Sequence, residues 1–189
     1  MVEELAPTTS AKVELRTRLR VLRRTLTMVQ RASAQDQVCQ RLSARFAAQP
    51  PVALASYAAL VDELSLDAWH AEWWADGNTL WFPRVHAPGV LSWHPITDPR
   101  QLRVGAYGIR EPQPALVPAA TLPASATVLI PGVAFTADGW RLGQGGGFYD
   151  RLLAVHQGPT IGLAFACQRI AELPRGPHDR RVSEVIFSD

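Results

Sequence analysis

The chain has 189 residues, of which 47% are hydrophobic and 19% are charged. This length suits one domain with a full core, and the apolar content excludes a disordered chain. The net charge of +2 is too small to argue for nucleic acid by itself. No apolar run approaches the roughly 20 residues that span a bilayer. The two cysteines lie far apart and form no CxxC pair, so we expect a reducing, cytoplasmic location.

The N-terminal quarter of the chain predicts two helices. Residues 1–9 are expected to form a flexible lead. Over residues 10–31, apolar side chains recur at spacings of four and three, which predicts one long amphipathic helix. The apolar positions of this helix are Leu15, Leu19, Leu22, Leu26 and Val29. A cap at residues 33–36 predicts a second helix that ends near residue 47, before a Pro-Pro pair.

Short apolar segments alternate with helical patterns along the rest of the chain. Strands are predicted at residues 52–57, 79–82 (closed by Pro83), 91–94, 128–130, 160–165 and 185–187. Helices are predicted at residues 65–74, capped by Ser65, and 148–156, and residues 95–127 are expected to be mostly loop. The alternation predicts a single α/β domain over residues 1–189, a three-layer sandwich whose mostly parallel sheet is flanked by helices.

The segment from Arg141 to Asp150 carries the strongest chemical signal. It contains four glycines, two aromatic residues, an arginine and an aspartate. The glycines allow positive φ and close approach of the backbone to a ligand. A helix is predicted to begin directly after them, and a helix N-terminus presents unpaired N–H groups that suit phosphate. Arg141 adds a cation, and Asp150 adds a carboxylate that could hold Mg²⁺ beside the same phosphates.

Standard nucleotide-binding patterns do not fit this segment. The GxxxxGK[ST] pattern needs a lysine after its last glycine, and the one lysine of the chain is Lys12. The GxGxxG pattern fails because Phe148 occupies its last glycine position. The segment therefore predicts a phosphate-binding loop of another design, and a glycine-rich turn without a ligand stays the alternative.

The chain resembles the 5-formyltetrahydrofolate cyclo-ligase family, also called the methenyltetrahydrofolate synthetases, over nearly its whole length. The resemblance is strongest at Pro131-Gly-Val-Ala-Phe135 and over residues 139–151. Smaller matches occur in the family's order: Lys12-Val-Glu-Leu-Arg16, Asp62-Glu63, Phe82-Pro-Arg84-Val, Gly108-Ile-Arg-Glu-Pro112 and Pro174-Arg-Gly-Pro-His-Asp179. By this resemblance the chain is expected to be a ligase of folate metabolism.

The resemblance implies a reaction between two small-molecule substrates, ATP and 5-formyltetrahydrofolate, with Mg²⁺ as cofactor. The formyl oxygen attacks the γ-phosphate, and the neighbouring nitrogen then displaces phosphate from the activated carbon. The products are 5,10-methenyltetrahydrofolate, ADP and phosphate. Because an amide oxygen is a poor leaving group, the enzyme must position both substrates and neutralise phosphate charge. We expect a monomer with neither a nucleic-acid nor a membrane partner.

The resemblance also assigns roles to particular residues. The residues expected to bind ATP are Lys12, Arg16, Arg141, Leu142, Gly143, Gln144, Gly145, Gly146, Gly147, Phe148 and Tyr149. The residues expected to contact the folate are Ala58, Glu63, Tyr107, Gln144, Gly145, Gly146, Gly147 and Phe148. Asp150 and Asp179 are the expected metal ligands, and Arg141 and Asp150 are the expected catalytic residues.

Several assignments have a simpler structural alternative. Lys12 and Arg16 share one helix face, but so crowded a basic helix could simply be solvated. Asp150 could be an acid favoured at a helix N-terminus, and Asp179 could pair with an adjacent arginine. Glu63 could face solvent. Tyr107 could equally be a packing residue.

The chain departs from the family pattern at a few positions. Gln144 and Phe148 stand where many members have an aromatic residue and a tyrosine, which affects the expected folate contacts. Ser183 stands where an acid is common, which leaves residue 183 without an expected metal role. The expected ATP and magnesium residues are all present.

Three other functions are considered. One is a paralogue that uses the same ATP loop on another substrate, and another is a folate- or nucleotide-binding protein without turnover. The arginine-rich first helix suggests a nucleic-acid binder, but the low net charge and the lack of aromatic residues among those arginines disfavour it.

Overall fold

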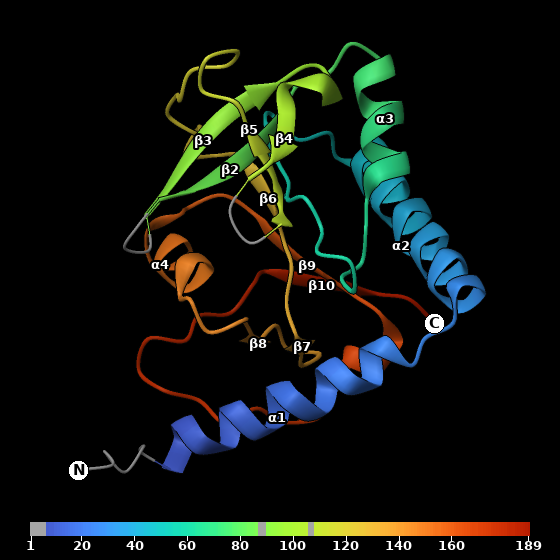
Figure 1. The fold of residues 1–189 in the computed structure, drawn as a ribbon, viewed down its shortest axis with the longest axis vertical. Helices are drawn as coiled ribbons and strands as arrows, with labels where there is room; N and C mark the ends of the chain where they lie inside the picture. The colour runs from blue at the N-terminus through green and yellow to red at the C-terminus, as the bar shows by residue number, and fades with distance from the viewer. Residues whose placement is uncertain (1–6, 87–89, 106–107) are drawn as a thin grey trace.

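A six-stranded sheet forms the centre of the protein, and the computed structural model describes residues 7–86, 90–105 and 108–189. The strand order is β10-β9-β6-β1-β2-β3, and every neighbouring pair is parallel except β2 and β3 (Figure 1). The bounds are β1 Leu54–Ala55, β2 Leu80–His86, β3 Val90–Ile96, β6 Thr127–Ile130, β9 Thr160–Ala164 and β10 Glu184–Phe187. The predicted α/β class with a mostly parallel sheet is therefore confirmed.

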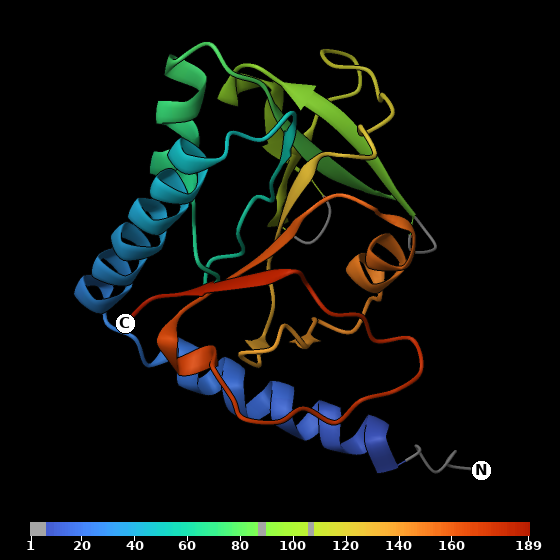
Figure 2. The same cartoon turned by 180° about the vertical axis from the view of Figure 1, so that it is seen from behind.

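Helices cover both faces of the sheet. Helices α2 (Met28–Ala48) and α3 (Asp67–Ala75) lie on one side, and α4 (Phe148–Val155) lies on the other (Figures 1 and 2). Alternate strand residues point to opposite faces. Leu129 of β6 accordingly packs in the cluster that contains α2 and α3, whereas its neighbours Val128 and Ile130 pack in the cluster that contains α4. Burial on both faces explains why the parallel strands are apolar throughout.

Helix α1 (Pro7–Arg24) lies outside these layers, along a small hairpin of β7 (Ala134–Phe135) and β8 (Arg141–Leu142). Leu15 and Leu19 of α1 pack against Leu142 and the β7 segment in a separate apolar cluster. A second hairpin joins β4 (Leu102–Val104) to β5 (Arg110–Pro112). Within the described residues, no helix combines the length and apolar character needed to cross a membrane.

The predicted long helix over residues 10–31 is in fact two helices, so that prediction was wrong. Thr27 caps α2 by accepting a hydrogen bond from the Gln30 N–H, while the Gln30 side chain accepts one from the Thr27 N–H. This reciprocal cap begins a new helix within the apolar pattern and replaces the cap predicted at residues 33–36. Helix α1 begins at Pro7, so residues 7–9 are helical, and residues 1–6 of the expected lead lie outside the described residues.

Strand β2 continues to His86, although Pro83 was expected to close it. The Trp81 carbonyl accepts a hydrogen bond from the Ser56 N–H, so the backbone polar groups of Trp81 face β1. The backbone of Pro83, two residues later, faces the same side. Strand β1 has ended at that level, so the missing N–H of Pro83 costs no hydrogen bond in the sheet. The β4–β5 hairpin likewise replaces part of the loop predicted over residues 95–127.

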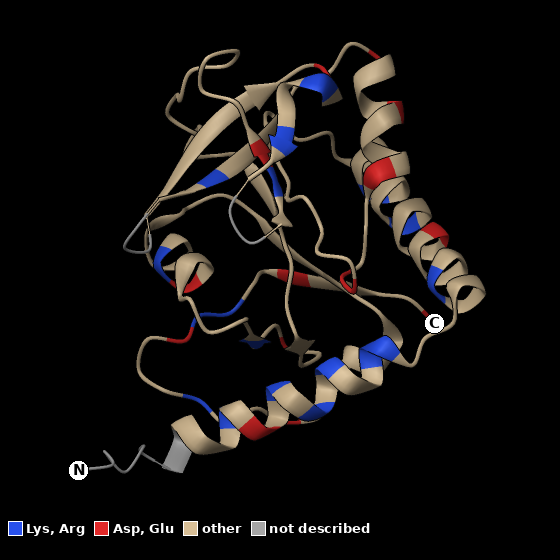
Figure 3. Ribbon diagram, viewed as in Figure 1, with Lys and Arg blue, Asp and Glu red and all other residues tan. Residues whose placement is uncertain are grey.

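Basic residues recur along α1 from Lys12 to its C-terminal end (Figure 3), and one of them, Arg23, is buried. The Arg23 side chain is 2% exposed, and its Nη2 lies 2.8 Å from Oδ2 of Asp62. Arg31 of α2 donates to the backbone carbonyls of both Arg23 and Asp62, at 3.0 Å each. The alternative that this basic helix is simply solvated is therefore wrong for Arg23, which anchors α1 to the body of the protein.

We predict that Arg23→Ala lowers the free energy of unfolding by about 3 kcal/mol or more, because it leaves the Asp62 carboxylate without its buried partner. The exposed Arg18 on the same helix provides the control, and Arg18→Ala is expected to cost less than about 0.5 kcal/mol. Urea unfolding of both variants measures the difference. Equal losses in the two variants would contradict the anchoring role.

A second buried titratable group, His70, lies on the buried face of α3. His70 is 2% exposed, its Nε2 lies 2.7 Å from Oγ of Ser56, and its ring packs against Phe82 and Trp74. Burial lowers the pKa of His70 from 6.5 to about 4. The imidazole is therefore neutral in the folded protein over a pH range in which the unfolded chain takes up a proton.

This shift predicts a pH dependence of stability. The contribution of His70 is fully present above pH 6.5 and is lost as the pH falls toward 4, because protonation then favours the unfolded chain. Between those values the wild type should lose about 3 kcal/mol more unfolding free energy than His70→Gln, which does not titrate. The exposed His178 provides the control variant His178→Gln. Parallel pH profiles for the wild type and His70→Gln would refute the assignment.

Candidate active site

A cavity of about 440 Å³ lies where β1 and β6 end, at the carboxyl edge of the parallel strands. The chain order reverses between these two strands, and open α/β sheets bind ligands at such a point. The apolar part of the lining includes Tyr57, Ala58, Leu60, Pro83, Val85, Leu91, Ile109, Phe148 and Tyr149. The polar and charged side chains are Glu63, Arg110, Glu111, Arg141, Gln144 and Asp150. A mainly apolar cavity with a few convergent polar groups is typical of a small-molecule site.

Residues 143–147, hereafter the glycine loop, connect β8 to α4 along one wall of this cavity. Gly145 has φ 109° and Gly147 has φ 67°, values that strongly favour glycine. Gly147 caps α4 without a side-chain hydrogen bond. The N–H groups of the first turn of α4 are therefore not occupied by a capping side chain, and the positive end of the helix dipole lies at the loop.

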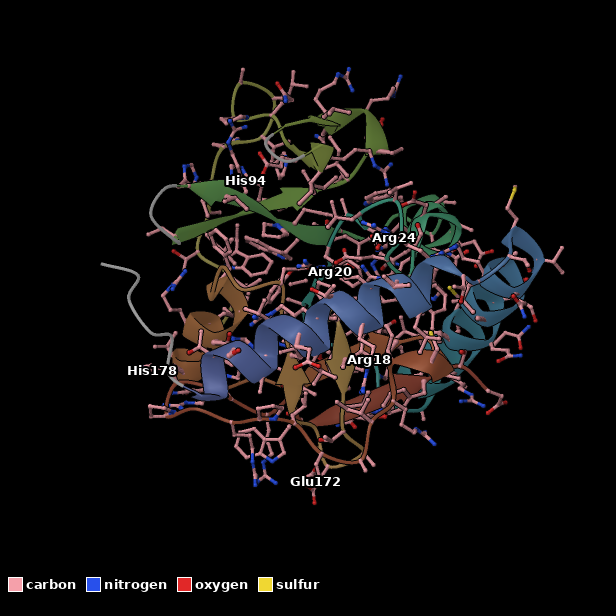
Figure 4. All side chains as sticks on the ribbon, turned by 60° about the horizontal axis from the view of Figure 1, so that its bottom comes forward. Arg18, Arg20, Arg24, His94, Glu172 and His178 are labelled. Atoms are coloured by element: carbon pink, nitrogen blue, oxygen red, sulfur yellow. The ribbon has the colours of Figure 1, made fainter. Side chains whose placement is uncertain are left out.

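The face of α1 that carries residues 12, 16 and 20 lies against the glycine loop. Arg16 Nε donates to the Gly143 carbonyl at 2.8 Å, and Arg20 donates to Gln144 Oε1 at 2.6 and 3.1 Å. Figure 4 shows Arg20 on the side of α1 that faces the body of the protein. Burial, followed by the nearby Arg20, lowers the pKa of Arg16, as expected where positive charges crowd together. This face is therefore not a solvated basic surface.

Arg141 lies beneath the glycine loop with its side chain 3% exposed. Its Nη2 donates to Oδ1 of Asp150 at 3.0 Å, and the guanidinium lies 5.5 Å from the ring centre of Tyr149. A Cβ at Gly143 would lie 2.6 Å from Nη1 of Arg141, so only glycine permits this close approach. Arg141 Nε is buried without a hydrogen-bond partner among the described residues.

Asp179 reaches the site from the C-terminal loop. Its carboxylate accepts hydrogen bonds from Lys12 Nζ at 2.5 and 2.8 Å and from the Gly176 N–H at 2.6 Å. Burial acts to raise the pKa of Asp179, but these hydrogen bonds outweigh it and leave the pKa below its ordinary value. Asp179 therefore pairs with Lys12 and not with an adjacent arginine.

The donor set near the glycine loop suits a hard divalent cation. Asp150 and Asp179 supply carboxylate oxygens, and the negative charge of each acts to raise the pKa of Arg16. Within residues 7–86, 90–105 and 108–189, no group of three or more metal-ligating side chains occurs. Mg²⁺ is commonly held by one or two carboxylates together with substrate phosphates and water, so two carboxylates fit this ion.

Glu63 is 7% exposed and faces the cavity, so the alternative of a solvent-facing acid is wrong. Its Oε1 accepts a hydrogen bond from Gln144 Nε2 at 2.8 Å, and its Oε2 accepts one from the Leu60 N–H at 3.1 Å. Gln144 thereby links Glu63 to Arg20. Burial, followed by the charge of Glu63, raises the pKa of Tyr149, so this phenol stays protonated as a hydrogen-bond donor.

The residues predicted from the sequence fall into two groups. Those that line the cavity are Ala58, Glu63, Arg141, Gly143, Gln144, Gly146, Gly147, Phe148, Tyr149 and Asp150. Those at the α1 side of the glycine loop are Lys12, Arg16, Gly145 and Asp179. Leu142 differs from both groups because it packs in the core beneath α1. Tyr107 lies outside the described residues.

Sequence reasoning missed three charged residues at the site. Arg20 contacts the loop, and its spacing of four from Arg16 was a signal that could have found it. Arg110 and Glu111 line the cavity from β5, within a region predicted to be loop, and the match to the family over residues 108–112 was a signal that could have found them. The Ser183 hydroxyl and backbone N–H are both hydrogen-bonded to the Thr160 hydroxyl. The serine that departs from the family pattern therefore has a structural role.

Comparisons with known proteins agree on one family. The model of the 5-formyltetrahydrofolate cyclo-ligase family matches residues 8–188. A 5-formyltetrahydrofolate cyclo-ligase of Haemophilus influenzae is 30% identical over 186 residues, covering 94% of this chain and 98% of the relative. One from Escherichia coli K12 is 30% identical over 168 residues, covering 82% and 88% of the two chains.

The structural comparison extends this agreement to the fold. A 5,10-methenyltetrahydrofolate synthetase of Aquifex aeolicus, solved by NMR, superimposes with a TM-score of 0.81 at 30% identity. The superposition covers 93% of this chain and 89% of the other. The matches span the glycine loop, the α1 face and the cavity walls together. The chain is therefore an enzyme that belongs to the 5-formyltetrahydrofolate cyclo-ligase family.

Proposed function

We propose that this enzyme uses ATP to cyclise 5-formyltetrahydrofolate to 5,10-methenyltetrahydrofolate, with release of ADP and phosphate. The observation that carries the proposal is the position of the glycine loop between two different surfaces. On one side lies the basic face of α1, and on the other lies a mainly apolar cavity of about 440 Å³. One loop can thus contact both a triphosphate and an organic ring system, and the family names of the relatives supply the identity of that ring system.

The triphosphate is expected to lie between the glycine loop and α1. Lys12, Arg16 and Arg141 supply positive charge there, and the first turn of α4 supplies N–H groups. Asp150 and Asp179 would hold Mg²⁺, which supplies further neutralisation of phosphate charge when bound. These groups together offset the charge that develops on the transferred phosphoryl group.

The reduced folate is expected to occupy the cavity. Tyr57, Val85, Leu91 and Phe148 offer apolar walls for a flat bicyclic ring, and the volume is within the range of sites for molecules of this size. Gln144, through its amide, would contact both substrates, because it lies in the glycine loop and also lines the cavity. The folate is thereby held with its formyl group toward the loop.

The reaction then requires two displacements. The formyl oxygen attacks the γ-phosphorus of ATP, and the bond from that phosphorus to the ADP oxygen breaks. The neighbouring nitrogen of the folate attacks the formyl carbon, loses its proton, and phosphate leaves with the former formyl oxygen. Arg141 would stabilise charge on the phosphoryl group in the first step. The apolar cavity walls exclude water that would otherwise hydrolyse the phosphorylated intermediate.

A paralogue acting on another substrate is the second candidate. The departures at Gln144 and Phe148 both fall on the wall shared with the folate, whereas the charged residues of the phosphate side are complete. Such a paralogue would consume ATP with a different amide. We further predict from the sequence that the enzyme acts as a monomer in the cytoplasm, and gel filtration tests the first of these predictions.

We predict that the pure protein converts 5-formyltetrahydrofolate in the presence of Mg-ATP, which is followed by the near-ultraviolet absorbance of the methenyl product. Asp150→Asn and Arg141→Lys should each lower kcat roughly 100-fold, the first because it removes a carboxylate charge and the second because an ammonium does not reproduce the donor geometry of the guanidinium. Glu172→Gln is the control, since Glu172 is exposed and points away from the body of the protein (Figure 4). A wild-type rate equal to that without ATP would reject the proposed function.

Substitutions of Lys12 and Arg18, on different sides of α1, are expected to distinguish a residue that binds the nucleotide from one that does not. Lys12→Ala should raise the KM for ATP about 10-fold or more, with little change in the KM for the folate, because the ammonium lies on the phosphate side. Arg18→Ala, on the opposite side of the same helix, should leave both values unchanged. A similar rise in both KM values for Lys12→Ala would argue against a specific phosphate contact.

A further inference from the structure

Glu111 is a buried carboxylate whose position the proposed reaction does not use. Glu111 belongs to β5, is 3% exposed to solvent, and lines the same cavity as Glu63. Its Oε1 has no hydrogen-bond partner among the described residues. Buried polar groups are nearly always hydrogen-bonded, because an unsatisfied acceptor loses its water without compensation. An unpaired carboxylate oxygen at a cavity wall therefore points to a donor that the described residues do not supply, such as a bound molecule.

The surrounding structure holds Glu111 in this orientation. Strand β5 pairs with β4 so that Glu111 lies opposite Arg103, and Arg84 of β2 donates to the Pro112 carbonyl at 2.8 Å. A Cβ at Gly105 would lie 2.5 Å from Oε2 of Glu111, so the carboxylate packs closely over that glycine. The neighbouring Arg110 is engaged elsewhere, in an ion pair with Asp67. The acid is thus fixed by the hairpin, and it forms no ion pair with the residues that the structure describes.

The two acids of the cavity differ in what they can still accept. Each oxygen of Glu63 already accepts a hydrogen bond, one from Gln144 Nε2 and one from the Leu60 N–H. Oε1 of Glu111 accepts no hydrogen bond from the described residues. Glu63 is accordingly suited to fixing the glycine loop through Gln144. Glu111 is the acid suited to receiving donors from a bound molecule.

We propose that Glu111 recognises the amino and ring N–H edge of the substrate's bicyclic ring. A planar carboxylate can accept two parallel hydrogen bonds from an amino group and an adjacent N–H, which a pterin presents on one edge. This assignment rests on the proposed function for the identity of the substrate. It makes Glu111 a binding and specificity residue in addition to Glu63, which the family resemblance expects to contact the folate.

The test measures the energetic coupling between Glu111 and the amino group of the ring. Dissociation constants are determined by intrinsic fluorescence for 5-formyltetrahydrofolate and for its 2-desamino-2-methyl analogue, with wild type, Glu111→Gln and Glu63→Gln. For the wild type, loss of the amino group should weaken binding roughly 10- to 100-fold. For Glu111→Gln the natural ligand should bind that much more weakly, and the analogue should lose little further affinity. For Glu63→Gln the full effect of the amino group should remain.

Two further readouts separate recognition from a merely structural role. The melting temperature of Glu111→Gln without ligand should equal or exceed that of the wild type, because the substitution removes an unpaired buried charge. The KM for ATP should not change. A lowered melting temperature with undiminished coupling to the amino group would make Glu111 structural and overturn the proposal, as would coupling found at Glu63 instead.

Failure of the Glu111 assignment can be distinguished from failure of the proposed function. If the wild type neither binds nor converts 5-formyltetrahydrofolate, the function itself is wrong, and the assignment of Glu111 to this ring is overturned with it. If the wild type turns over normally and Glu111→Gln matches it in affinity for both ligands, the function stands and the assignment alone is wrong. Glu172→Gln is the matched acid-to-amide control at an exposed position.

Discussion

The contact between the basic face of α1 and the glycine loop is the interaction on which the site depends. Arg16 holds the Gly143 carbonyl, and Arg20 holds the Gln144 side chain. These bonds fix a loop whose backbone conformations at Gly145 and Gly147 would otherwise be poorly defined. They require α1 to lie across the β7–β8 hairpin, which the break before Thr27 permits and the buried Arg23–Asp62 pair maintains. A continuous helix through residue 31 would carry α2 away from the sheet.

The glycine loop also separates two electrostatic environments. Toward α1, cationic side chains and the N-terminus of α4 produce a positive potential, and Asp150 and Asp179 limit it. Toward the sheet, the walls of the cavity are mainly apolar and carry few charged side chains. Charge interactions are stronger where water is excluded. A phosphoryl group held at this boundary is therefore strongly attracted to the cations, while the apolar walls keep water away from the formyl oxygen that accepts it.

The parts of the structure that local patterns govern could be predicted from the sequence. The glycine loop, the start of α4 after it and the apolar parallel strands each follow from a short run of residues, and the family resemblance placed the charged residues in order. The break between α1 and α2 could not be predicted, because Leu22, Leu26 and Val29 continue an unbroken apolar pattern across it. Arg23 was missed for a related reason. Its burial depends on Asp62, a partner distant in the chain, which no local pattern encodes. Glu111 lies in a hairpin where mostly loop was predicted, so its position on the cavity wall was missed as well.

The most direct test of this account is a crystal structure with Mg²⁺ and a non-hydrolysable ATP analogue. The account predicts that the triphosphate lies between the glycine loop and α1, with its oxygens on the backbone N–H groups of residues 145–149 and beside Lys12 and Arg16. The nucleotide's γ-phosphate should face the cavity that contains Glu63 and Glu111. A nucleotide bound elsewhere, or loop N–H groups that donate to the protein's own acceptors while the nucleotide is bound, would contradict the central claim.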